Sequence, residues 1–214
     1  YAATGSYDVT LTVTGPGGTD TLLRSACVTA HEAVSASFVG NPLEGVAPLD
    51  VTFTDQSVGD YDTCDWDFGD GETATGCEGV SHTYAAAGSY DVTLTVTGPG
   101  GSDTLARYSY VSVYEAPMAS FVADPLEGPA PLEVEFTNQS TGDYNTCAWD
   151  FGDGSTTTGC TGVRHTYEAV GSYDVTLTVT GPGGSDTLSR SAYVTAHEAV
   201  SASFMGDPLE GVAP

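Results

Sequence analysis

The sequence predicts an all-β protein built from tandem β-sandwiches, and three observations lead to this prediction. The stretch GSYDVTLTVTGPGG occurs at residues 5–18, 88–101 and 171–184, so the chain repeats with a period of 83 residues, the size of one small domain. Each copy alternates apolar with polar residues, which is the period-two pattern of a half-buried strand. No segment shows the periodicity of an amphipathic helix.

The strands are predicted in order along one period. They are residues 36–39, 49–54, 64–68, 88–97 and 105–113, with Pro, Gly and Asp turns between them. Six or seven short strands in 83 residues are typical of an immunoglobulin-like sandwich. Trp66 and Trp149 are expected to be its buried tryptophans, and Tyr90 and Tyr173 lie where a tyrosine corner belongs.

The ordered motifs resemble those of the polycystic-kidney-disease (PKD) type domain. WDFGDG occurs at 66–71 and 149–154, HTY at 82–84 and 165–167, and PLEG at 42–45 and 125–128. The resemblance covers the whole chain. It implies a β-sandwich found in secreted and surface proteins, often in tandem, that acts as a spacer, adhesion or binding module without catalysis.

The repeat predicts two complete domains, at residues 34–116 and 117–199. Residues 1–33 are interpreted as the last two strands of a preceding domain, and residues 200–214 as the first strand of a following one.

The charge is strongly acidic, with 29 Asp and Glu residues against four arginines and no lysine, a net charge of −25. The chain therefore cannot present a basic face to nucleic acid, and no apolar run is long enough to insert into a membrane. We expect cations, basic groups or further copies of the chain as its partners.

Cysteine spacing predicts two disulfides, Cys64–Cys77 and Cys147–Cys160. A two-residue turn at Asp70-Gly71 would place Cys64 directly opposite Cys77 in a hairpin, and the second copy repeats the same arithmetic. Disulfides indicate an extracellular or cell-surface location. Cys27 aligns with Tyr110 and Tyr193, and it is either a small buried replacement for tyrosine or an exposed thiol that crosslinks chains.

The aspartates of WDFGDG suggest calcium ligands, because alternating carboxylates before a glycine resemble a calcium loop. The candidate set is Asp65, Asp67, Asp70, Asp150 and Asp153. Some PKD-like domains bind calcium. In the alternative interpretation these residues form a solvated turn, and Ala148 in the place of Asp65 favours that view.

Seven further positions have both a structural and a functional interpretation. His82 and His165 are expected to bond nearby backbone groups, and His31 and His197 lie at domain junctions. Asn138 begins an N-glycosylation sequon. Tyr61 and Tyr144 are the candidate exposed aromatics for a carbohydrate site.

The sequence favours a structural function over catalysis, because no nucleophile lies beside a base and no constellation is unique. We expect a subunit of an extracellular fibre, stalk or filament of tandem domains. The alternative is an adhesin or an accessory binding module for carbohydrate or protein. The outward residues of GSYDVTLTVTGPGG are identical in all three copies, through recent duplication or through a repeated docking surface.

Overall fold

The computed structural model describes residues 1–205, in which the chain forms eighteen strands and no helix. Among these residues there is accordingly no helix of the length and apolarity needed to cross a membrane. The chain divides into two compact units, with the boundary between Glu115 and Ala116. The first unit begins with a separate hairpin of β1 (Gly5–Gly15) and β2 (Gly18–Ala30).

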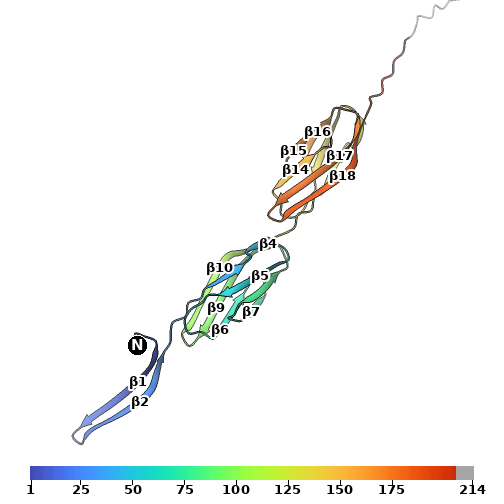
Figure 1. Ribbon diagram of the computed structural model, residues 1–214. Coiled ribbons are helices and arrows are strands. Elements are labelled where there is room, and N and C mark those ends of the chain that lie inside the picture. The colour runs from blue at the N-terminus through green and yellow to red at the C-terminus, as the bar shows by residue number, and fades with distance from the viewer. Residues whose placement is uncertain (206–214) are drawn as a thin grey trace, which may run out of the picture. The chain divides into compact units, whose positions relative to one another are not determined.

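The first sandwich packs a five-stranded sheet against a three-stranded sheet (Figure 1). Its strands are β3 (Phe38–Asn41), β4 (Glu44–Val46), β5 (Leu49–Asp55), β6 (Thr63–Asp67), β7 (Thr73–Thr75), β8 (Val80–Tyr84), β9 (Gly88–Gly98) and β10 (Gly101–Tyr114). The sheets have the orders β4-β10-β9-β6-β7 and β3-β5-β8. Only β4 pairs in parallel, with β10. The predicted all-β, immunoglobulin-like sandwich is confirmed.

The second sandwich repeats this topology strand for strand. Its strands are β11 (Phe121–Asp124), β12 (Glu127–Pro129), β13 (Leu132–Asn138), β14 (Thr146–Asp150), β15 (Thr156–Thr158), β16 (Val163–Tyr167), β17 (Gly171–Gly181) and β18 (Gly184–His197). The sheets have the orders β12-β18-β17-β14-β15 and β11-β13-β16. The same sequence pattern therefore gives the same fold twice.

Each sandwich has its own core of alternate residues from both sheets. In the first, Trp66 is 1% exposed and packs edge-on against Phe38, with ring centroids 5.3 Å apart. Trp149 and Phe121 make the same contact at 5.3 Å in the second. Because β5, β6 and β9 alternate inward and outward residues, their apolar side chains all reach this core.

A tyrosine corner closes each core, as the sequence predicts. The Tyr90 hydroxyl donates a hydrogen bond to the Ala86 carbonyl at 2.8 Å, and Tyr173 bonds Ala169 in the same way at 2.7 Å. Each bond fixes the entry into the long strand that follows.

The predicted strand positions differ from the observed ones at the short strands. The first strand begins at Phe38 rather than at residue 36. The strands β4 and β7, of three residues each, and β8, of five residues, were not predicted. Three residues are too few to display an alternation. The HTY motif lies on β8, which pairs with β5 in the three-stranded sheet.

The outer segments of the chain keep their predicted interpretation as parts of further domains, which the structure does not test. Hairpin β1–β2 exposes an apolar face, with Leu11 and Val13 at 61% and 55% exposure. The equivalent Leu94 and Val96 are fully buried. Residues 200–205 form no strand, and residues 206–214 of the predicted following strand lie outside the described residues.

Candidate functional site

The solvent face of each five-stranded sheet carries paired hydroxyl side chains. Thr95 and Thr104 lie with their hydroxyl oxygens 2.9 Å apart, as do Thr178 and Thr187 in the second sandwich. Cross-strand threonine pairs of this kind stabilise a sheet by about 0.2–1 kcal/mol each. The repeated outward threonines therefore have a role inside their own hairpin, whether or not a neighbour docks on them.

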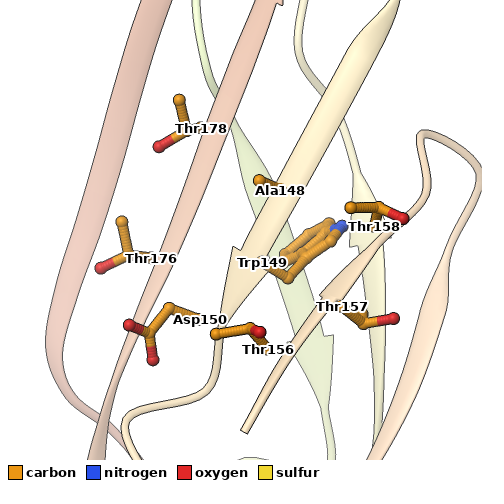
Figure 2. A pocket seen from close by; sticks show the side chains of 8 residues that line it. All are labelled: Ala148, Trp149, Asp150, Thr156, Thr157, Thr158, Thr176 and Thr178. Atoms are coloured by element: carbon orange, nitrogen blue, oxygen red, sulfur yellow. The ribbon is translucent and has the colours of Figure 1, made fainter. Parts of the chain in front are cut away.

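A shallow hollow lies on this face of the second sandwich, above β14, β15 and β17 (Figure 2). Its volume is about 630 Å³, and it is lined by Ala148, Trp149, Asp150, Thr156, Thr157, Thr158, Thr176 and Thr178. The matching hollow above β6, β7 and β9 has about 370 Å³ and contains Asp65 at the position of Ala148. Both hollows offer hydroxyl groups and at least one carboxylate, a set that can hydrogen-bond a polar ligand.

The predicted calcium ligands are not assembled into a metal site. Asp67 accepts a hydrogen bond from the Gly69 N–H at 2.9 Å. Asp70 uses both oxygens, one for the Glu72 N–H and one for His82. In the described part of the chain, ligand atoms of three residues gather within 4.8 Å only at Asp55, Cys64 and Cys77, where the disulfide occupies both sulfurs. No three of the predicted ligands gather in this way in the described residues, so calcium binding stays a prediction.

The WDFGDG loops instead supply the carboxylates of two histidine–aspartate pairs, in which His82 is buried and His165 is half-buried. His82 Nε2 lies 2.7 Å from Asp70 Oδ2, and His165 Nε2 lies 2.7 Å from Asp153 Oδ2. The His82 ring also stacks on Phe68, with centroids 4.2 Å apart. The histidines are structural, as predicted, but they bond side chains rather than the backbone.

Burial in this region also perturbs titration. It raises the pKa of Tyr84, whose hydroxyl donates to the Phe68 carbonyl, and burial raises the pKa of Tyr167 in the same position of the second sandwich. Burial alone would raise the pKa of Asp153, but hydrogen bonds from Ser155 and His165 outweigh it, so that pKa lies below its ordinary value.

Both predicted disulfides are present, with Cα atoms 5.2 Å apart for Cys64–Cys77 and 5.1 Å apart for Cys147–Cys160. The hairpin register on which they were predicted is wrong by one residue. Asp67 pairs with Thr73, so the loop has five residues and Cys64 lies opposite Gly76. The loop is wider than a two-residue turn because Phe68 enters the core within it.

The disulfides differ in one neighbouring side chain. Asp55 Oδ2 lies 3.3 Å from Cys64 Sγ and accepts the Tyr61 hydroxyl at 3.1 Å. At the equivalent position, Asn138 Nδ2 donates to Cys147 Sγ at 3.6 Å and to the Cys160 carbonyl at 3.1 Å.

The same geometry bears on the glycosylation sequon. The nitrogen that would carry a glycan is the half-buried Asn138 Nδ2, which is engaged in these bonds. The folded structure therefore argues against a glycan at Asn138.

Tyr61 and Tyr144 do not form an exposed aromatic platform. Both are half-buried, and their hydroxyls lie within hydrogen-bond distance of the Ser57 and Ser140 carbonyls. The candidate carbohydrate-stacking site therefore loses its aromatic surface.

Residues 31–37 connect β2 to the first sandwich, and a loop of that sandwich holds this connecting segment in place. Asp60 Oδ2 accepts hydrogen bonds from the Glu32 N–H at 3.0 Å and from His31 Nδ1 at 3.1 Å. The Asp60 N–H donates to the Glu32 carbonyl, and its own carbonyl accepts the Gly100 N–H. The Glu32 N–H and His31 together lower the pKa of Asp60. His31 is thus a junction residue with a defined partner, and His197 lies 3.8 Å from Glu127.

An aspartate on the first strand of the long hairpin holds a β-bulge in each sandwich, a role that was not predicted from the sequence. Asp91 Oδ1 accepts the Ser109 N–H at 2.6 Å, and Asp174 accepts the Ala192 N–H at 2.7 Å. Ser109 has a φ of 47°, so its unusual backbone is fixed by this bond. The aspartate of SYDV in the repeated stretch is therefore a structural residue.

Cys27 is an exposed free cysteine on β2. Its equivalent in the first sandwich, Tyr110, packs edge-on against Phe38 and accepts the Gly40 N–H at 2.9 Å. In a complete sandwich, the residue at this position therefore contacts the strand that packs across the core, as Tyr110 contacts β3. Neither alternative for Cys27 is tested by the isolated hairpin, and both stay predictions.

The two sandwiches have the same strand order, and the class of protein is therefore a tandem repeat of immunoglobulin-like domains. The PKD domain family matches residues 41–113 and 114–196, and the chain belongs to this family.

Solved structures with similar folds include immunoglobulin domains. The N-terminal four Ig domains of Dscam1 isoform 4.44 match at 18% identity and a TM-score of 0.44, covering 82% of this chain and 50% of that chain. The amphioxus IgVJ-C2 molecule matches at 16% identity and a TM-score of 0.48, covering 71% and 99%. A carbohydrate-binding module of the β-sandwich superfamily matches at 17% identity and a TM-score of 0.37, covering 74% and 90%. The chain thus spans about half the length of the Dscam1 structure.

Proposed function

We propose that this chain is a segment of an extracellular structural array, a fibre, stalk or cell-surface filament of tandem PKD domains, and that it has no catalytic role. The array would present an acidic surface, and its partners would be neighbouring domains and further copies of the chain. The two disulfides support an oxidising, extracellular environment.

The observation that carries this proposal is the repetition of the main structural features at a spacing of 83 residues. The cores, disulfides, tyrosine corners, bulges and histidine–aspartate pairs all occur twice in the same places. A catalytic or ligand-specific protein needs one distinctive constellation, whereas a spacer needs the same unit many times.

The bonds at the incoming connection support the same function. A rod requires that each junction be held rather than free, and Asp60 bonds both the N–H and the carbonyl of Glu32. In the second sandwich the Gly183 N–H bonds the Asp143 carbonyl, as Gly100 bonds Asp60 in the first.

Immunogold electron microscopy of intact producing cells tests the proposal, with antibody raised against the purified chain. We expect gold particles in rows along structures outside the cell, and none on cells from which the gene is deleted. Label confined to the cell interior, or protein found only as free monomer in the medium, would refute the array.

The second candidate is a binding module, and the matching hollows on both sandwiches favour it. A polar ligand such as a carbohydrate or an extended peptide would contact Asp150 and the surrounding threonines. Binding to a glycan or peptide array that is lost in Thr178→Arg, but kept in Thr187→Arg outside the hollow lining, would support this function.

A further inference from the structure

The two disulfides lie in different electrostatic environments, although they occupy equivalent places in the fold. Cys64 and Cys147 are buried, and Cys77 and Cys160 are half-buried. The difference comes from the side chain that touches the buried sulfur, which is a carboxylate in the first sandwich and an amide in the second.

The orientation of each neighbour is fixed by the same backbone bond. Asp55 Oδ1 accepts the Ser57 N–H at 2.8 Å, which directs Oδ2 toward Cys64. Asn138 Oδ1 accepts the Ser140 N–H at 2.9 Å, which directs the NH₂ group toward Cys147. The amide therefore presents donors to the sulfur, whereas the carboxylate presents only acceptors.

This difference acts on a thiolate that forms at the buried sulfur. A thiolate at Cys147 would accept a hydrogen bond from Asn138, which stabilises the anion. A thiolate at Cys64 would face the Asp55 carboxylate across 3.3 Å, and two negative charges at that separation repel each other strongly. Reductive cleavage is therefore easier in the second sandwich.

Access to the second disulfide is open as well. A hollow of about 480 Å³ borders it, lined by Asn145, Thr146, Cys147, Ala148, Thr158, Gly159 and Cys160. Cys147 and Cys160 are followed in the sequence by the neutral residues Ala148 and Thr161. The equivalent residues after Cys64 and Cys77 are Asp65 and Glu78, whose charges repel an approaching thiolate.

We propose that Cys147–Cys160 is a site of thiol–disulfide exchange with small thiols, and that Asp55 protects Cys64–Cys77 from the same reaction. A thiolate attacks the half-buried Cys160 Sγ, the S–S bond breaks, and its electron pair leaves on Cys147 Sγ beside Asn138. The product is a mixed disulfide on Cys160. A second thiolate then attacks the sulfur of the bound small thiol and releases Cys160 as a thiolate, so two thiols become one small disulfide and the protein gains two thiols.

The test compares the two reduction rates within one folded molecule. The purified chain is exposed to 2-mercaptoethanol, a neutral monothiol, for increasing times, then acid-quenched, alkylated and analysed by peptide mass spectrometry. We expect alkylation of Cys147 and Cys160 to appear on the order of tenfold faster than that of Cys64 and Cys77. The rates are measured at low salt and at about 1 M salt, which screens the surface charges of Asp65 and Glu78 but not the buried contact.

Two exchanged variants assign the effect to the neighbouring side chain. Asn138→Asp should slow the second disulfide toward the rate of the first, and Asp55→Asn should accelerate the first toward the rate of the second, at both salt concentrations. Each variant carries the residue that the other sandwich tolerates at that position, and unchanged melting curves confirm the fold. Equal rates in the unmodified chain would overturn the proposal. A rate difference that both variants leave unchanged, or that vanishes at high salt, would overturn the role of Asp55 and Asn138.

Discussion

Single aspartates fix the backbone of this protein at places where the sequence suggests only solubility. Asp8, Asp91 and Asp174 each accept the N–H of the bulge residue on the partner strand. The bulge residue has a positive φ in all three hairpins, and without the carboxylate its N–H would lose its partner. The aspartate is thus needed wherever the long hairpin occurs, which is a reason for its presence in every copy.

Replacing one such aspartate should destabilise its sandwich. We expect Asp174→Ala to lower the free energy of unfolding of the second sandwich by about 1–3 kcal/mol, because a charge-assisted bond is lost and a strained residue is released. Denaturant unfolding measures the change. Glu168→Ala removes one negative charge from an exposed residue and should change stability by less than about 0.5 kcal/mol. Equal effects of the two variants would contradict the assigned role.

The Asp153 carboxylate predicts acid sensitivity of the second sandwich. Its pKa is lower in the folded state than in the unfolded chain, because the bonds from Ser155 and His165 outweigh burial. A group with a depressed folded-state pKa stabilises the fold above its unfolded pKa of about 3.9, and this contribution is lost as the pH falls through the folded value.

Asp153→Asn should therefore cost about 1–2 kcal/mol at pH 7 and progressively less below about pH 4, as melting curves across this range will show. Glu168→Gln serves as the charge control and should keep the pH dependence of the unmodified chain. A cost of Asp153→Asn that stays constant down to pH 3 would rule out this titration.

At the residue scale, the sequence predicted the disulfides and the tyrosine corners but not the neighbours of the sulfurs. The cysteine pairing was predicted from the spacing of the cysteines. The prediction is correct although its hairpin register is wrong by one residue, because Cys64 and Cys77 still lie 5.2 Å apart at Cα. The contacts of Asp55 and Asn138 depend on loop geometry that brings β5 and β6 together. No periodicity in the sequence encodes such contacts.

Among the elements, the GPGG turn does more than reverse the chain. A Cβ on Gly100 would lie 1.9 Å from the Glu32 carbonyl oxygen, and one on Gly98 would lie 2.4 Å from the Tyr61 Cα. The turn β9–β10 can therefore approach the connecting segment only because residue 100 is glycine, and it can approach the loop around Tyr61 only because residue 98 is glycine. In hairpin β1–β2, a Cβ on the identical Gly17 would meet nothing within 4 Å.

Gly100→Ala should accordingly loosen the connecting segment. We expect a loss of about 1–3 kcal/mol from the clash, together with faster amide hydrogen exchange at Glu32 and Asp60. Gly17→Ala is the matched control from the same sequence and should change neither measurement. Protection at Glu32 that is identical in both variants would show that the turn does not hold the connection.

The long strands were predictable because eleven residues of strict alternation, as in β9, leave no other interpretation. The strands β4 and β7 were not, since each has three residues and its place is set by pairing with β10 and β6. The five-residue strand β8, which pairs with β5, was not predicted either. The hollow above β14, β15 and β17 was equally hard to predict, because it depends on how these three strands pair, which no periodicity of the sequence encodes.

For the whole molecule, the main electrostatic property is the excess of acidic residues, which is evident from the sequence. The first predicted domain, residues 34–116, contains thirteen acidic residues and one arginine, and the second, residues 117–199, contains eleven acidic residues and two arginines. The structure pairs some of this charge locally, as where Arg164 contacts Glu133 and Glu135, each at 3.2 Å. Most carboxylates remain on the surface, where they repel one another.

This repulsion predicts that salts stabilise the protein without selectivity. We expect the melting temperature to rise with sodium chloride, and to rise equally with calcium and magnesium at matched ionic strength, because Asp67 and Asp70 are already committed to bonds within their loop. Differential scanning calorimetry in each salt, with a chelator as the reference, makes the comparison. A larger shift with calcium that disappears in Asp67→Asn and Asp150→Asn would show that these loops rearrange to bind the ion.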